Sequence, residues 1–369
     1  MPFSPEPPHT HGNAPITGVL LCNLGTPDAP TASAVRRYLR EFLSDARVVE
    51  IPRLLWLLIL HGIILRFRPA KSARKYQSIW TPAGSPLKVW TEKQAKLLQG
   101  WLGQRNHRVT VLPGMRYGSP AITAQLDALK AQGATRILVL PAYPQYSGTT
   151  TASVCDAVYA WAQHTRTLPE LRFVNHYHDD PDYLFALAAS VQRHWQKHGE
   201  PDQLVMSFHG VPKRTLELGD PYHCECHKTA RLLAERLGLG PKDYVVTFQS
   251  RFGKAKWLEP YTEPTLRELA KAGVKRVDVI CPGFVTDCIE TLEEIAIEGK
   301  QAFLDAGGQH FHYIPCLNDS SYWMEALSAL TLRHLQGWPT QALTGAEQTA
   351  LQAQQQEQLQ RARALGAKR

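Results

Sequence analysis

An imidazole and a row of carboxylates in the second half of the chain have the residue types that bind divalent metals or transfer protons. His209 ends an apolar run, and Glu290, Glu294 and Glu298 follow another such run at intervals of four residues. This spacing places the three carboxylates on one face of an α-helix. An imidazole and a carboxylate that share one site can hold a divalent cation or accept protons from a substrate. We therefore take His209 and Glu290 as the candidate catalytic and metal-binding pair, with Glu294 and Glu298 as a route for protons or metal.

Each of these residues also has a purely structural interpretation. A histidine at the end of a buried strand is often a hydrogen-bonded core residue, and a row of acids is usually a solvated helix face. Asp287 and Glu290 have the three-residue spacing of a capping box, with Asp287 in the role of the capping residue. The sequence alone leaves both interpretations open.

The segment His-Cys-Glu-Cys-His at 223–227 has the composition of a metal-binding cluster. Its C-x-C spacing is tighter than the spacing of structural zinc sites, and no second cysteine pair stands at a suitable distance. A metal in this segment is therefore the less favoured interpretation. The glycine-rich phosphate loops of nucleotide-binding proteins are absent from the sequence, and so is the G-x-S-x-G elbow.

Aromatic and cationic side chains complete the candidate site. Aromatic residues stand at or just after several expected strands, namely Tyr117, Tyr143, Tyr146, Trp257 and Phe284. Such residues usually belong to a core, but in a cleft they would suit a large, flat, apolar ligand. Basic residues follow an apolar segment, namely Arg68, Lys71, Arg74 and Lys75. They form either a solvated helix face or a binding site for the carboxylates of that ligand.

Eight short apolar runs predict the strands that position these side chains. They span 18–25, 109–113, 136–141, 171–177, 203–209, 244–249, 277–281 and 311–315. Several are continuous rather than alternating, which is typical of strands buried on both faces of a parallel sheet, and helical stretches separate them. The sequence therefore predicts an α/β fold with helices on both faces of parallel sheets.

The two sets of four strands repeat one another. LGTP at 24–27 corresponds to HGVP at 209–212, RYG at 116–118 to RFG at 251–253, GATR at 133–136 to GVKR at 273–276, and HDDPDY at 178–183 to LNDSSY at 317–322. Four matched landmarks in the same order predict a duplicated four-stranded domain. Ligands of open parallel sheets lie beyond the carboxyl ends of the strands, so the cleft between the two copies is the expected site.

The domain limits follow from composition. We expect a disordered leader over 1–15, one domain over 16–190, a second over 191–330, and a basic tail rich in Gln and Ala over 331–369. An apolar segment at 51–67 is too short to cross a bilayer, which takes about 20 apolar residues. It is either a buried core helix or an exposed apolar lip that contacts a membrane surface or a flat ligand.

Composition and charge narrow the classes of partner. The chain has 369 residues, of which 44% are hydrophobic and 20% charged, and this balance excludes disordered, collagen-like and disulfide-scaffold proteins. Its net charge of +8 suits nucleic acid, an anionic membrane surface or an acidic small molecule. We expect no nucleic acid partner, because the basic residues are dispersed and no recognised binding motif is present. Seven cysteines and no secretory leader indicate a cytoplasmic protein, with peripheral contact at the inner membrane surface left open.

The motifs carried by this scaffold resemble those of the ferrochelatase family. The matching segments, spread over residues 18–330, are NLGTP (23–27), KYQSIW (75–80), GSPLKVWT (84–91), GMRYGSP (114–120), YPQYSGTTT (143–151), SFHGVP (207–212), GDPY (219–222), FQSRFGKAKWLEP (248–260) and GFVTDCIETL (283–292). The resemblance implies two similar Rossmann-like domains, each with a four-stranded parallel sheet, and an active cleft between them. It also implies a lyase of haem biosynthesis that inserts Fe²⁺ into protoporphyrin IX, with no cofactor required.

The resemblance also assigns roles to residues. It makes His209 and Glu290 the iron-site pair. The residues expected around the macrocycle are Arg116, Tyr117, Trp257 and Phe284, and those expected to face its propionates are Arg68, Lys71 and Ser85. A chelatase for a different tetrapyrrole or metal, and a non-catalytic porphyrin or haem carrier, remain as alternatives.

The cysteines of this chain differ from those of its relatives in the family in two ways. Many members have histidine where this chain has Cys288, so a second imidazole beside Glu290 is missing. Animal members hold an iron–sulfur cluster on a C-terminal extension that carries cysteines, whereas no cysteine follows Cys316 here. We therefore expect no iron–sulfur cluster, and a cluster at Cys224 and Cys226 is the lesser alternative.

Overall fold

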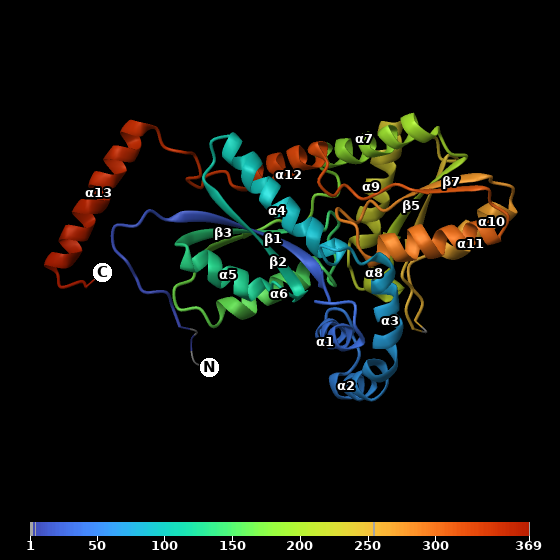
Figure 1. The fold of residues 1–369 in the computed structure, drawn as a ribbon, viewed down its shortest axis with the longest axis horizontal. Coiled ribbons are helices and arrows are strands. Elements are labelled where there is room, and N and C mark those ends of the chain that lie inside the picture. The colour runs from blue at the N-terminus through green and yellow to red at the C-terminus, as the bar shows by residue number, and fades with distance from the viewer. Residues whose placement is uncertain (1–2, 4, 254, 369) are drawn as a thin grey trace.

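The computed structural model describes residues 3, 5–253 and 255–368 as an elongated molecule built on two parallel four-stranded sheets (Figure 1). The strands are β1 (Ile16–Thr26), β2 (Val109–Gly118), β3 (Ala134–Pro141), β4 (Glu170–Phe173), β5 (Gln203–His209), β6 (Tyr244–Gln249), β7 (Arg276–Ile280) and β8 (His310–Tyr313). The first sheet has the order β2-β1-β3-β4, and the second has the order β6-β5-β7-β8. The eight predicted strands and the predicted duplication are thus confirmed.

Helices connect the strands and cover the sheets. They are α1 (Ala32–Leu43), α2 (Arg53–Ile59), η1 (Leu60–Ile64), α3 (Leu65–Ile79), α4 (Pro86–Gln104), α5 (Ile122–Ala131), α6 (Thr151–Ala162), α7 (Pro181–His198), α8 (Lys213–Glu217), α9 (Tyr222–Leu237), α10 (Thr262–Lys271), η2 (Glu290–Gly299), α11 (Lys300–Asp305), α12 (Ser321–His334) and α13 (Gly345–Ala364). The two elements labelled η are π-helices.

Alternate residues of the central strands enter different cores, as the continuous apolar runs predict. In β1, Val19 and Leu21 pack in the same cluster as α4, whereas Leu20 packs with α5 and α6. In β5, Met206 packs with α9, whereas Val205 packs with α10, α11 and η2. Each sheet is therefore covered by helices on both faces.

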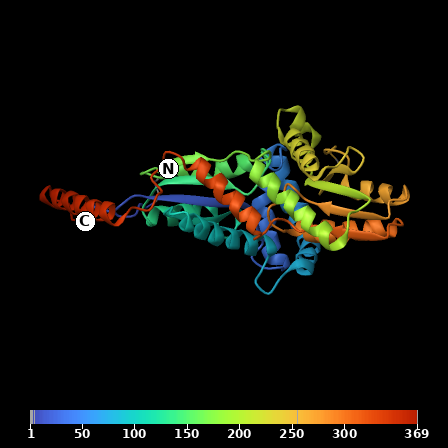
Figure 2. The same cartoon turned by 90° about the horizontal axis from the view of Figure 1, so that it is seen from above.

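One hydrophobic cluster runs through both halves of the molecule, from β1 and α4 to β5 and α9. Helix α12, which follows the last strand, packs against α7 and α4 of the first half, and Figure 2 shows α7 and α12 side by side. The division expected between residues 190 and 191 falls inside α7. The two sheets are therefore joined by shared helices and a shared core.

The apolar segment at 51–67 is an exposed lip, which we define as α2, η1 and the first turn of α3. The exposed fractions of Leu54, Leu58 and Phe67 are 82%, 73% and 76%, whereas Trp56 and Leu60 are buried. The alternative of a buried core helix is therefore wrong. No helix among the described residues is both long enough and apolar enough to traverse a bilayer.

The chain ends differ from each other in their contacts. In the segment before β1, the Glu6 carboxylate pairs with Lys130 and accepts hydrogen bonds from the backbone N–H groups of Arg166 and Thr167. At the other end, α13 begins with a capping box formed by Thr344 and Glu347 and buries none of its side chains. Figure 1 shows α13 standing apart from both sheets.

Candidate functional site

His209 is the last residue of β5, and the residue after it must be glycine for β6 and its loop to pack so closely. A Cβ atom on Gly210 would lie 2.7 Å from the carbonyl oxygen of Gln249 and 3.1 Å from the ring of Trp257. The centroid of the His209 ring lies 6.4 Å from that of Trp257 and 6.4 Å from that of Phe284. The end of β5 thus brings together three of the residues predicted for the site.

The hydrogen bond of His209 leaves one ring nitrogen free for chemistry. Its Nδ1 lies 2.6 Å from the carbonyl oxygen of Gly210. Because a carbonyl oxygen can only accept, Nδ1 carries the proton, and in the neutral ring Nε2 keeps its lone pair. His209 can therefore accept a proton or ligate a metal through Nε2 while its orientation is held by Nδ1.

The candidate carboxylates lie on η2, a π-helix of ten residues rather than the α-helix expected from their spacing. A π-helix bonds residues i and i+5, so residues five apart come to one side. Glu293 and Glu298, five apart, share the ammonium group of Lys75 at 2.9 and 2.7 Å. The single row expected for Glu290, Glu294 and Glu298 is therefore divided, because Glu298 turns toward Lys75.

Lys75 links α3, the helix that continues from the lip, to the carboxylate helix η2. It lies on α3, and its partners Glu293 and Glu298 lie on η2. Burial alone would lower the pKa of Lys75, but the bonds to the two carboxylates raise it overall. Burial also raises the pKa of Glu293, although Lys75 opposes the change. The ion pairs of Lys75 with Glu293 and Glu298 therefore connect the first half to the second beside the candidate site.

Glu294 is turned inward and held by the loop after β6. The backbone N–H of Ser250 lies 2.6 Å from its Oε1, and the Ser250 hydroxyl donates to its Oε2. Burial raises the pKa of Glu294, and the bonds from Ser250 and the nearby His209 ring oppose that increase. His209 is thus close enough to Glu294 to lower the pKa of that carboxylate.

Glu290 faces the first half of the molecule. Burial raises the pKa of Tyr76 on α3, and the charge of Glu290 raises it further. Glu290 has the same effect on the buried Tyr38 of α1. Burial and Glu290 also raise the pKa of the Cys288 thiol, so near neutral pH this side chain is neither a base nor a thiolate ligand.

The capping-box interpretation of Glu290 is wrong. Asp287 Oδ1 accepts a hydrogen bond from the Tyr313 hydroxyl at 2.6 Å, and its Oδ2 accepts one from Asn318 Nδ2 at 2.6 Å. The N-terminus of η2 has no hydrogen bond from a capping side chain. The fixed carboxylate of Asp287 therefore braces the loop in front of η2.

Arg68 is the predicted cation that lies nearest to the second half. Its guanidinium carbon lies 4.5 Å from the centroid of the Phe252 ring, on the loop after β6. Burial lowers the pKa of Arg68, and no acidic side chain among the described residues lies within ion-pair distance of it. Lys71, one turn further along α3, is exposed. Arg68 is thus a partly buried cation without an anionic partner.

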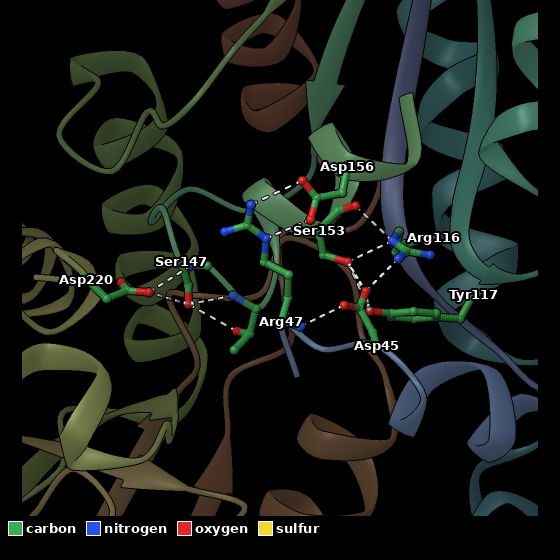
Figure 3. Close-up of polar contacts among 10 residues, drawn as sticks. Asp45, Arg47, Arg116, Tyr117, Ser147, Ser153, Asp156 and Asp220 are labelled. Atoms are coloured by element: carbon green, nitrogen blue, oxygen red, sulfur yellow. Dashed lines mark hydrogen bonds and ion pairs between the residues drawn. The ribbon is translucent and has the colours of Figure 1, made fainter. Parts of the chain in front are cut away.

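Arg116 and Tyr117, near the end of β2, are joined to Asp45 in a hydrogen-bonded network (Figure 3). Arg116 Nη2, the Tyr117 hydroxyl and the Ser153 hydroxyl all donate to Asp45 Oδ2, at 2.5, 2.8 and 2.6 Å. Burial alone would raise the pKa of Asp45, but these bonds lower it overall. Burial raises the pKa of Tyr117. Tyr117 is fully buried, so its ring belongs to the core, and Arg116 is the member of this pair that lines a cavity.

Ser85 lies at the start of α4 and is buried. Its hydroxyl oxygen accepts a hydrogen bond from Thr26 Oγ1 at 2.8 Å. Because Ser85 only accepts in this bond, its own O–H can still donate, and the bond does not exclude the predicted contact with a propionate. The structure places Ser85 as part of the packing between β1 and α4.

Two cavities lie beside the lip. The first has a volume of about 780 Å³ and is lined by Tyr38, Asp45 and Arg116 among others. The second has a volume of about 720 Å³ and is lined by Leu54, Leu58 and other residues of the lip. Neither of these two cavities is lined by His209 or Glu290. Both therefore lie on the first-half side of the candidate site.

The segment at 223–227 lies in the first turns of α9, where its members face different directions. His223 stacks on Phe248 with ring centroids 5.7 Å apart, and the tilted ring of His227 lies with its centroid 6.0 Å from that of Phe248. Cys224 is exposed, whereas Cys226 is fully buried and burial raises the pKa of its thiol. The two cysteines therefore do not face a common site, and Glu225 has partners of its own, described below.

Sequence reasoning missed several side chains of the site. Glu293, Gln249 and Ser250 were not singled out, yet Glu293 pairs with Lys75 and the other two contact η2. Asp45, which holds Arg116, was missed as well. The only signal for Glu293 was its place in an acidic segment, because its partner lies 218 residues away.

Comparisons with known proteins identify one family. The sequence profile of the ferrochelatase family matches residues 16–335. The ferrochelatase of Methylibium petroleiphilum is 67% identical over 367 residues, which cover 100% of this chain and 99% of that protein. The ferrochelatase of a Polaromonas strain is 70% identical over 346 residues, which cover 93% of this chain and 94% of that one.

A solved structure supports the fold. The solved structure of SirB from Bacillus subtilis with Fe³⁺ matches 86% of this chain and 95% of its own, with a TM-score of 0.53 and 14% sequence identity. At this low identity the likeness concerns the arrangement of the elements alone.

Proposed function

This chain belongs to the ferrochelatase family, and we propose that His209 and Glu290 are the residues at which it performs metal insertion. The protein is a lyase that inserts Fe²⁺ into protoporphyrin IX to form haem. The reaction joins one Fe²⁺ to the macrocycle and releases two pyrrole protons, with no change in oxidation state. The site must therefore supply a base and a group that delivers the metal.

The free Nε2 of His209 is the observation that carries the proposal. Because Nδ1 donates to the carbonyl oxygen of Gly210, the lone pair of Nε2 can take a pyrrole proton. The rings of Trp257 and Phe284, each with its centroid 6.4 Å from that of His209, offer flat apolar surface for the macrocycle. His209 is accordingly the base on the side of the second half.

Glu290 serves as the opposing carboxylate in this scheme. It faces Tyr38 and Tyr76 of the first half, whose pKa values it raises. Glu294 is close enough to His209 for the imidazole to lower the pKa of the carboxylate. Glu290 therefore accepts the second proton or presents the metal, and Glu294 relays protons, whereas Glu298 belongs to the Lys75 contact.

Arg68 is the residue that best fits a propionate of the macrocycle. It is partly buried over Phe252, and no described carboxylate neutralises it. A guanidinium binds a carboxylate through two parallel hydrogen bonds. Lys71 supplies a second, more solvated cation on the same helix.

The exposed leucines of the lip suit a peripheral contact with a membrane. Leu54 and Leu58 stand out from the surface, and Arg53 and Arg66 flank them. Apolar side chains flanked by cations are typical of segments that lie on an anionic bilayer. We infer a cytoplasmic protein that takes up its apolar substrate at the membrane surface.

Replacement of His209 by alanine tests the proposal. Fe²⁺ and protoporphyrin IX are mixed with the protein without oxygen, and the Soret absorbance is followed. Loss of a positioned base lowers kcat by about 100-fold or more. The control is H223A, which removes another histidine that lies on a ring of the second half, Phe248. If H209A and H223A insert iron at similar rates, the assignment of His209 is wrong.

A further inference from the structure

Three side chains with metal-ligating atoms meet where the two halves join, and none of them belongs to the site described above. His176 and His178 lie between β4 and α7 of the first half, and Glu225 lies on α9 of the second. Their ligand atoms all lie within 4.8 Å of one another. His176 Nδ1 is 2.7 Å from Glu225 Oε1, and His178 Nδ1 is 3.3 Å from Glu225 Oε2.

We propose that His176, His178 and Glu225 form a second metal site, which binds a divalent transition-metal cation such as Zn²⁺ and ties the two halves of the molecule together. Two imidazoles and one carboxylate are a ligand set that zinc accepts, with a fourth position left for water. His176 is half-exposed, whereas His178 and Glu225 are buried. The cation therefore has an entry path from solvent on one side and fixed ligands on the other.

The geometry of the two imidazoles supports this assignment. Their rings meet edge to face, with centroids 5.0 Å apart. His178 Nδ1 is buried and has no hydrogen-bond partner among the described residues. A buried nitrogen left without a partner costs free energy, and a cation bound to both the nitrogen and the carboxylate would remove that cost. Ligand atoms about 2.1 Å from a tetrahedral zinc are separated by about 3.4 Å, close to the 3.3 Å between His178 and Glu225.

Neighbouring groups hold the ligands in place. The Tyr146 backbone N–H donates to Glu225 Oε2 at 2.7 Å, and the Thr229 hydroxyl donates to the carbonyl oxygen of His178 at 2.8 Å. Contacts of this kind, behind the ligands, orient them toward a metal. Both also cross between the halves, so the bound cation would reinforce an existing contact.

A second cluster of two histidines and one carboxylate is less suited to a metal. His194 and His312 both approach Asp278, but Arg276 already donates to each oxygen of that carboxylate at 3.1 Å. A divalent cation there would lie beside a fixed positive charge. At the proposed site, by contrast, the ammonium group of Lys228 pairs with Asp179, which is not one of the proposed ligands.

The test measures zinc binding to the full chain without porphyrin. The background carries H209A, so that binding at the proposed insertion site is weakened from the outset. Metal-free protein is titrated with Zn²⁺ by calorimetry, and its thermal unfolding is followed with and without Zn²⁺. We expect one equivalent of Zn²⁺ to bind and to raise the melting temperature, because a ligand of the native state alone stabilises it.

Two variants identify the ligands, and a third variant serves as the control. E225Q and H176A should each weaken zinc binding by about tenfold or more and abolish the rise in melting temperature. H223A removes a histidine of the same helix that faces Phe248, and it should bind zinc as the parent does. If E225Q fails to fold, the half-exposed His176 still decides the outcome. Zinc binding to H176A and E225Q within twofold of that to H223A would overturn the proposal.

This outcome is independent of the insertion reaction. Failure of the proposed role of His209 would appear as iron insertion by H209A, whereas failure of the second metal site would appear as unchanged zinc binding in the ligand variants.

Discussion

Glu294 is locked onto Ser250 by two hydrogen bonds, one from the backbone N–H at 2.6 Å and one from the hydroxyl group. The loop after β6 thereby holds a buried carboxylate beside His209. Its charge is set by burial, which raises its pKa, against the opposing effects of Ser250 and His209.

This relationship predicts a pH dependence of stability for E294Q. A raised pKa means that the folded state binds the proton more tightly than the unfolded state, whose Glu titrates near pH 4.3. Ionisation of Glu294 therefore costs stability as the pH rises from about 4.3 through the higher pKa of the folded state. Wild type should lose stability relative to E294Q across that interval, as measured by urea unfolding between pH 4 and pH 8. A difference between the two proteins that stays constant with pH would contradict the prediction.

Replacement of Arg68 should affect substrate binding rather than turnover. A propionate keeps its charge throughout the reaction, so its contact with Arg68 is equally strong in the ground and transition states. We expect R68A to raise KM for protoporphyrin by about tenfold, since a hydrogen bond to a charged group contributes about 1.5–3 kcal/mol, and to leave kcat within about twofold. The exposed Arg74 on the same helix gives the control R74A. With a porphyrin dimethyl ester as substrate, the difference between R68A and wild type should disappear.

The network around Asp45 predicts a loss of stability. D45N removes the charge that Arg116 and Tyr117 both contact, and a partly buried guanidinium is left without its partner. The free energy of unfolding should fall by about 2–4 kcal/mol. D156N disrupts the exposed pair with Arg47 and should change it by less than about 1 kcal/mol. Equal effects of the two substitutions, measured by urea unfolding, would show that Asp45 has no special structural role.

The lip predicts a separation between stability and membrane binding. Leu58 is exposed, so L58S should change the free energy of unfolding by less than about 0.5 kcal/mol. Leu60 is fully buried in the next turn, and L60A should cost about 2–5 kcal/mol. L58S combined with L54S should reduce sedimentation with anionic vesicles, because both leucines lie on the outer surface. Unchanged vesicle binding by this double variant would exclude the lip as the contact.

The fold was predictable from sequence because its signals are local. Each apolar run specifies a buried parallel strand, and matched landmarks such as LGTP and HGVP show the duplication without any tertiary information. His209 and its neighbours Trp257 and Phe284 were predictable for the same reason, since His209 ends a strand and the two aromatic residues follow strands.

The remaining features depend on contacts between distant parts of the chain. The segment from Glu290 to Gly299 has the composition of an ordinary helix, and nothing local marks it as a π-helix whose Glu293 meets Lys75. The hydroxyl of Tyr117 bonds to Asp45, 72 residues away. Likewise, a run of leucines has the same sequence whether it is buried or exposed. The exposure of the lip is therefore visible only in the structure.

The two halves share one strand order, yet the helix that follows the third strand is the α-helix α6 in the first half and the π-helix η2 in the second. A duplicated scaffold permits a division of labour between its copies. The first copy carries a conventional α-helix at this place together with the lip, and the second carries a π-helix lined with carboxylates.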